Sequence, residues 1–109
     1  KKILISGSAV QMEGQLSVLK SGLNDTLPCY ECIFPKTTEK APITNCREAG
    51  IIGSITAFIA SMQVSEAIKE IALLNYPSIA GYLILYDGFS QSLDKIKVTK
   101  KNNCLICSN

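Results

Sequence analysis

The chain has 109 residues, 47% of them hydrophobic and 18% charged, which allows one folded domain at most and excludes a disordered segment. Its formal charge of +2 and the lack of basic patches with interleaved aromatic residues give no electrostatic argument for a nucleic-acid partner. The longest stretch without charge, residues 49–65, is too short and too polar for a membrane span. No signal peptide is visible. The chain opens on Lys1 and not on a methionine, which suggests a fragment or a processed piece.

Two pairs of cysteines, each with two intervening residues, are the strongest signal: Cys29 with Cys32, and Cys104 with Cys107. In a chain without histidine, two such pairs are typical of a tetrahedral zinc site, because zinc prefers thiolate sulfur and the spacer lets both sulfurs turn onto one ion. We therefore predict a structural zinc, with two disulfides or two unrelated thiol pairs as alternatives. Four thiolates and one zinc ion would cancel the formal charge. Five cysteines, four of them in these pairs, favour a reducing, cytoplasmic setting.

Short apolar and β-branched runs bounded by turn residues predict four strands. These are residues 3–5, 15–19, 82–86 and 93–98. Ser6 to Ser8 should end the first strand, and Glu13-Gly14 should form a turn or bulge before the second. Asp87-Gly88 is a strong turn signal between the last two strands. Residues 21–28 are expected to form a loop, and the polar residues 35–44 an exposed, mobile crossing loop.

A long helix is predicted over residues 46–74, with Asn45 as its N-cap and Glu48 placed for a capping box. The first half carries no charge after Glu48, as expected of a helix packed on all sides. Charges return at Glu66, Lys69 and Glu70, so the second half should reach solvent. Such a helix needs more covering surface than this chain supplies, which hints at missing partner structure.

Cys46 is the cysteine outside the two pairs. At a helix start, beside Arg47, unpaired backbone N–H groups and the helix dipole would lower the pKa of its thiol and make it nucleophilic. An ordinary small buried residue is the alternative. The chain lacks a histidine base, which excludes a cysteine protease, and it has no glycine-rich phosphate-binding motif. A redox dithiol would need an accessible pair on a helix, and neither pair is expected there. The residues alone therefore indicate a zinc-stapled α/β piece with one candidate thiol and no assigned substrate.

Several short motifs follow one another along the chain. They are Ser6-Gly7-Ser8-Ala9-Val10, Met12-Glu13-Gly14-Gln15, Pro28-Cys29-Tyr30-Glu31-Cys32, Phe34-Pro35, Asn45-Cys46-Arg47-Glu48-Ala49-Gly50, Glu66-Ala67-Ile68-Lys69, Tyr86-Asp87-Gly88 and the closing Cys104-Leu105-Ile106-Cys107. In this order and at these approximate spacings they resemble the carboxyl-terminal half of the E1-like activating enzymes of the MoeB/ThiF (HesA/MoeB/ThiF) family. Each motif alone is weak, whereas the ordered set is specific and covers essentially the whole chain.

The resemblance implies the C-terminal part of a Rossmann-like E1 adenylation fold, with mixed or antiparallel strands, one long central helix and a four-cysteine zinc site. It also implies homodimeric enzymes that use Mg-ATP to adenylate the C-terminal glycine of a ubiquitin-like sulfur-carrier protein in molybdopterin or thiamine biosynthesis. Cys29, Cys32, Cys104 and Cys107 match the family's zinc ligands. Cys46 matches a crossing-loop cysteine that in some members forms a covalent sulfur or acyl link and in others is dispensable.

The family's glycine-rich loop, its phosphate-contacting residues and its metal-binding aspartate lie in an amino-terminal half that this sequence lacks. We therefore expect residues 1–109 to be the C-terminal portion of the adenylation domain, without ATP turnover of its own, and Mg-ATP to bind only through the other half. Gln11, Glu31 and Ser54 depart from residues common in relatives, and the motif around Gly14 favours the molybdopterin branch. The alternative is a non-catalytic, zinc-stapled interaction module of the same fold.

Overall fold

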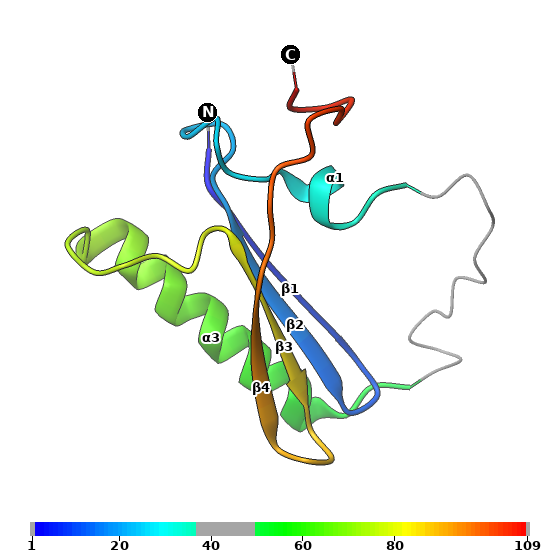
Figure 1. Cartoon of the computed structure of the whole chain (residues 1–109). Coiled ribbons are helices and arrows are strands. Elements are labelled where there is room, and N and C mark those ends of the chain that lie inside the picture. The colour runs from blue at the N-terminus through cyan, green and yellow to red at the C-terminus, as the bar shows by residue number, and fades with distance from the viewer. Residues whose placement is uncertain (1, 37–49, 109) are drawn as a thin grey trace.

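The structure, a computed structural model, describes residues 2–36 and 50–108. Its elements are β1 (Leu4–Val10), β2 (Glu13–Leu19), α1 (Tyr30–Ile33), α3 (Gly53–Ala72), β3 (Tyr82–Asp87) and β4 (Ser92–Lys97). The four strands form one antiparallel sheet in the order β1-β2-β3-β4, and α3 crosses one of its faces (Figure 1). The predicted α/β class, with antiparallel strands and one long helix, is confirmed. Within the described part of the chain, no helix is long and apolar enough to cross a membrane.

The first strand continues through Ser6, Gly7 and Ser8, so the prediction that these residues end it is wrong. The glycines serve a different purpose, because α3 lies directly against the sheet. A Cβ atom at Gly7 would lie 2.6 Å from Gln63 Cδ, and one at Gly14 would lie 2.5 Å from Ile59 Cγ1. Gly14 therefore belongs to β2 and not to the predicted turn. Small residues at these two positions let the helix approach the strands closely.

The reversal between β1 and β2 falls at Gln11 and Met12, where Gln11 has a φ of 53°. Gln11 also holds the segment that precedes α3. Its backbone N–H donates to the Gly50 carbonyl over 3.1 Å, and its own carbonyl accepts from the Ile52 N–H over 3.3 Å. These two bonds form a short parallel bridge between Gln11 and Ile51. Because bridged backbone is not helical, α3 begins at Gly53, and the predicted start at Cys46 is wrong. Asn45, the predicted N-cap, lies outside the described residues.

The second half of α3 reaches solvent as predicted, but not all of its charges mark the solvent side. Ile55, Ile59 and Glu66 are buried against the sheet, whereas Val64 is 58% exposed and Ile71 is 81% exposed. Among the described residues only one face of the first half is packed, which agrees with the prediction that this helix needs more covering surface than the chain supplies. The charged side chains of the second half form ion pairs. Glu66 Oε1 lies 2.7 Å from Lys69 Nζ, and Glu70 Oε1 lies 2.6 Å from Lys20 Nζ.

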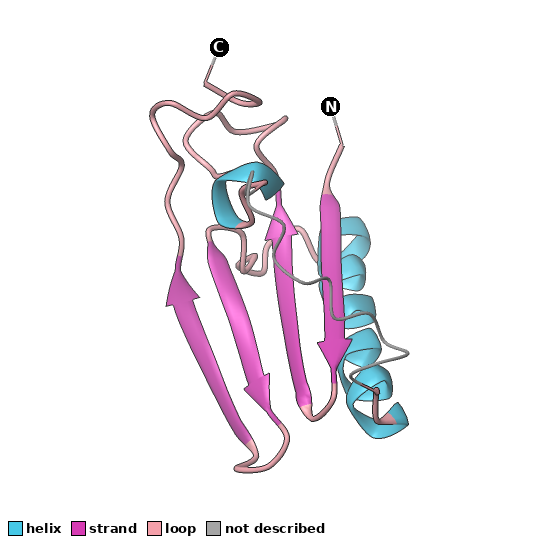
Figure 2. Cartoon of the chain, turned by 90° about the vertical axis from the view of Figure 1, so that its right-hand side faces the viewer, coloured by secondary structure: helices cyan, strands magenta, loops and turns pink. Residues whose placement is uncertain are grey.

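The core under α3 consists of Ile55, Ile59 and Tyr86, with Phe58 and Met62 half-buried beside them. The rings of Phe58 and Tyr86 lie 4.4 Å apart between centroids. The helix packs chiefly on β1 and β2, and in the described part of the chain β3 and β4 have no helix behind them (Figure 2). Strands β3 and β4 agree with the predicted strands to within a residue at each end, and the turn between them begins at Gly88 as predicted.

Candidate metal centre and open sheet face

The first cysteine pair is presented by the one-turn helix α1. Cys29 is its N-cap, and the Cys32 N–H donates to the Cys29 carbonyl over 3.1 Å, which turns both side chains to the same side. This pair lies on a helix, but both residues are buried, so it is not the accessible helical pair that a redox dithiol needs.

The second pair lies on a tight turn that follows β4. The Cys104 N–H donates to the Lys101 carbonyl over 3.2 Å, and the Ser108 N–H donates to the Cys104 carbonyl over 3.1 Å. The Ser108 hydroxyl donates to the same Lys101 carbonyl over 2.8 Å. These bonds fix a short loop whose cysteines face the first pair, at the end of the sheet where both chain termini lie (Figure 1).

The four sulfurs meet in one compact cluster. Cys29 Sγ lies 3.8 Å from Cys32 Sγ and 3.7 Å from Cys104 Sγ, which comes from a residue 75 positions away. Cys32 Sγ lies 3.5 Å from Cys107 Sγ, and all four sulfurs lie within 4.8 Å of one another. An ion with Zn–S bonds of about 2.3 Å in tetrahedral geometry places its sulfurs about 3.8 Å apart. The donor set and its spacing therefore fit a metal ion such as zinc.

The disulfide alternative does not agree with this arrangement. All four cysteines of the cluster are free, and the sulfur separations are far longer than the S–S bond of about 2.05 Å. The two predicted pairs are thus brought together as one four-sulfur site. Cys46, the fifth predicted site residue, lies outside the described residues.

The surroundings of the four sulfurs shift the pKa values of the thiols in opposite directions. The backbone N–H groups of Ile106 and Cys107 lower the pKa of Cys104 to about 6, whereas burial and the neighbouring thiols raise the pKa of Cys107 to about 12. Burial also raises the pKa of Cys29. For Cys32, burial acts in the same direction, but hydrogen bonds with the backbone of Lys101 and Cys29 outweigh it and lower the pKa. A divalent cation at the centre would compensate the thiolate charge that burial disfavours.

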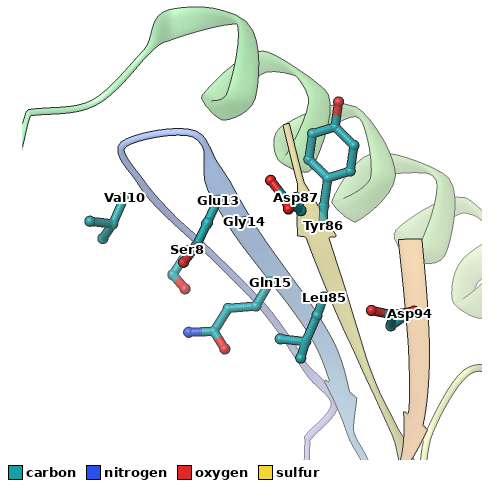
Figure 3. Close-up of a pocket in the computed structure, with 9 residues that line it drawn as sticks. All are labelled: Ser8, Val10, Glu13, Gly14, Gln15, Leu85, Tyr86, Asp87 and Asp94. Carbon is teal, nitrogen blue, oxygen red and sulfur yellow. The ribbon is translucent and has the colours of Figure 1, made fainter. Parts of the chain in front are cut away.

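Among the described residues, the sheet face opposite α3 is open and carries a pocket of about 430 Å³ near the β1–β2 turn (Figure 3). Its side chains come from alternate positions of all four strands: Ser8, Val10, Glu13, Gln15, Leu85, Asp87 and Asp94. The register places Glu13 opposite Asp87, and Gln15 opposite Leu85. Tyr86, the neighbour of both Leu85 and Asp87, turns its ring toward α3 instead, where it meets Phe58.

This acidic grouping was not evident in the sequence, where Glu13 and Asp87 form no pair. The signal that could have found it is the strand register, because residues opposite one another in neighbouring strands share a face. The helix α1 bounds the same face at its other end, where Tyr30 and Phe34 line a small hollow together with Ser6 and Leu83. The open face therefore extends from the β1–β2 turn to the element that carries the first cysteine pair.

Residues 1–107 match the ThiF family. The chain is also similar to proteins named adenylyltransferase and sulfurtransferase MOCS3. It is 44% identical over 111 residues to the protein of Culex quinquefasciatus, and 41% identical over 109 residues to those of Drosophila persimilis and Aedes aegypti. Each similarity covers 99% of this chain but only 23% or 24% of the relative, so the chain spans about a quarter of their length. Because the family match extends over nearly all of its residues, the chain belongs to the ThiF family.

Proposed function

We propose that the protein containing this chain is an ATP-dependent adenylyltransferase that activates the C-terminal glycine of a ubiquitin-like sulfur-carrier protein. The observation that carries the proposal is the similarity along 99% of the chain to proteins named adenylyltransferase and sulfurtransferase, at 41% to 44% identity. The family resemblance of the ordered motifs leads to the same activity. The pathway we favour is molybdenum cofactor biosynthesis, with thiamine biosynthesis as the alternative.

In this proposal the 109 residues supply the structural part of the enzyme. Cys29, Cys32, Cys104 and Cys107 hold a zinc ion that ties the end of the chain to α1, which supports one end of the open sheet face. That face offers a broad surface for the carrier. The sequence contains no glycine-rich phosphate-binding loop, so Mg-ATP would bind through another part of the protein, and these residues alone should not turn over ATP.

Cys46 is the residue for which we propose a covalent role. Its thiolate would attack the acyl carbon of the carrier adenylate, forming a thioester and releasing AMP with the electrons of the broken acyl–phosphate bond. The support is its place in the Asn45-Cys46-Arg47 motif that resembles the family's crossing-loop cysteine. We further propose a cytoplasmic homodimer, on the family resemblance and on a cysteine content that suits a reducing compartment.

The test is ATP–pyrophosphate exchange by the full-length protein with its zinc bound. Exchange should require the carrier and should be lost when the carrier lacks its terminal glycine, because the acyl group to be adenylated is then changed. Cys46→Ser should keep exchange but lose any thiol-sensitive covalent adduct with the carrier. Absence of carrier-dependent exchange would overturn the adenylation proposal and favour the non-catalytic interaction module of the same fold.

A further inference from the structure

The outer face of α3 is an apolar strip, here called the α3 strip. Six exposed residues form it: Ala57, Ala60, Ser61, Val64, Ile68 and Ile71. All of them lie within about 60° of Val64 around the helix axis. The buried Ile55 and Ile59 lie on the opposite side, against the sheet. Figure 2 shows the sheet on one side of α3 and no described strand or helix on the other.

The α3 strip carries no charged side chain, so burying it against another apolar surface costs little electrostatic free energy. The nearby Glu66 and Lys69 point away from the strip and pair with each other at 2.7 Å. Ser61 is the polar member of the strip, and its hydroxyl already donates to the Ala57 carbonyl over 2.8 Å. Because this bond would persist in a dry interface, Ser61 can be buried without an unpaired donor.

The side chains of the strip change in size from one end to the other. The first half has the small Ala57 and Ala60, the second half has the bulky Ile68 and Ile71, and Val64 lies at the centre. Two copies of α3 packed antiparallel about a two-fold axis at Val64 would place Ala60 opposite Ile68, and Ala57 opposite Ile71. Each bulky side chain would then meet a small one, which suits ridges-into-grooves packing. The strip is therefore complementary to itself, as a two-fold interface requires.

The area of the strip is close to what a stable dimer needs. The 20 residues of α3 span about 30 Å, and half of a helical cylinder of that length presents roughly 600 Å² to solvent. Ile52 before the helix and Leu74 after it are 44% and 77% exposed, and they add apolar surface at both ends. A stable interface buries about 800 Å² per partner, and homodimer interfaces are apolar at their core. The strip with its flanks fits the core of such an interface.

We propose that the α3 strips of two copies of this protein pack antiparallel about a two-fold axis at Val64 and form the centre of a homodimer interface. This inference rests on the homodimer proposed above and gives it an interface, but it does not depend on the adenylation reaction. A covering segment from elsewhere in the same protein would require no symmetry in the strip. The equal spacing of small and bulky residues about Val64 favours a second copy as the occupant.

The first test measures the mass of the full-length, zinc-bound protein by analytical ultracentrifugation, and the wild type should be a dimer. Val64→Glu should raise the dimer dissociation constant about 100-fold or more, because it brings two carboxylates together at the axis. Val64→Lys should act in the same way, and an equimolar mixture of the two variants should recover the dimer. Val10→Glu is the matched control, because it makes the same change at an exposed valine on the open sheet face, and it should leave the mass unchanged.

The second test checks the register by disulfide cross-linking with diamide, in a Cys46→Ser background that removes the thiol outside the cluster. Val64→Cys should give a cross-linked dimer, because the two copies of this residue face each other at the axis. Ile71→Cys alone should not, because its two copies would lie about 20 Å apart along the helices. Mixing Ile71→Cys with Ala57→Cys should restore the cross-link.

The outcomes separate this interface from the rest of the proposed function. A monomeric wild type would overturn the homodimer and the interface together, whatever the result of carrier-dependent ATP–pyrophosphate exchange. A wild-type dimer that withstands both charged variants of Val64 and does not cross-link through Val64→Cys would overturn the interface alone. In that case another segment of the same protein covers the strip, and the two copies pair through a different surface.

Discussion

The described residues supply all four cysteines of the cluster but cover only one face of helix α3. The cluster collects four sulfurs from segments 75 positions apart, and all lie within 4.8 Å of one another. By contrast, α3 buries one face on the sheet and leaves an apolar face exposed, with Ile71 81% exposed. A metal centre needs only four ligands, whereas a helix with two apolar faces needs a layer on each side. The described residues supply both cysteine pairs but only one of the two layers.

The largest expected effect comes from removing a metal ligand. In the full-length protein, Cys104→Ser should reduce the zinc content from one per chain to nearly none. Structural zinc contributes on the order of 10 kcal/mol of binding free energy, so its loss should strongly destabilise the linked segments. Hydrogen exchange should accelerate in residues 29–36 and 98–108, while the paired interior of β2 keeps its protection. Metal analysis and hydrogen-exchange mass spectrometry provide the two measurements.

Cys46→Ser is the control for that experiment, because we do not place Cys46 among the zinc ligands. It should retain one zinc per chain and the exchange pattern of the wild type. Purified wild-type protein that contains well under one metal ion per chain, with all four cluster thiols reduced, would contradict the metal centre.

The second comparison concerns the two faces of α3 and uses the same substitution on each. Ile59→Ala, on the packed face, should lower the free energy of unfolding by about 2–5 kcal/mol, because it opens a cavity in the core. Ile71→Ala, on the exposed face, should change it by about 0.5 kcal/mol or less in the 109-residue chain. Urea unfolding of both variants measures the difference. Equal costs in this chain would show that the exposed face is already covered.

The smallest effect concerns the ion pair between Lys20 and Glu70, which joins the end of β2 to the end of α3. Burial alone would raise the pKa of Glu70, but the hydrogen bond from Lys20, 2.6 Å away, and that from Ser78 lower it below 4.5. Because the folded-state pKa is the lower one, the pair stabilises the protein above about pH 4.5 and loses its contribution as the pH falls through the folded-state pKa.

The contribution of this pair should be about 0.5 kcal/mol, because both side chains retain contact with solvent. Lys20→Met should remove this part of the acid dependence, measured as the free energy of unfolding between pH 6 and pH 3. A pH profile of the variant parallel to that of the wild type would show that the pair contributes nothing to it.

The strands and the cysteine cluster were the features that local pattern could predict. Strand runs such as residues 82–86 contain β-branched and aromatic residues next to a clear turn signal, and two closely spaced cysteine pairs restrict the possible sites to very few. The predictions from glycines and charges were wrong because the roles of these residues depend on tertiary contacts and not on local pattern. Gly7 interrupts no strand, because its role is contact with α3, and Glu66 marks no solvent face, because its charge is paired beside the sheet.

The sequence by itself therefore determined the four cysteines of the cluster, the α/β class and the family, since each depends on residue types at fixed spacings. The tertiary structure decided which face of α3 packs, where that helix begins and which side chains share the open sheet face. These features depend on contacts between residues far apart in the chain, such as Gly14 with Ile59 and Gln11 with Ile52. Local propensities are too weak to fix such contacts, because packing across the sheet contributes more free energy than any single residue preference.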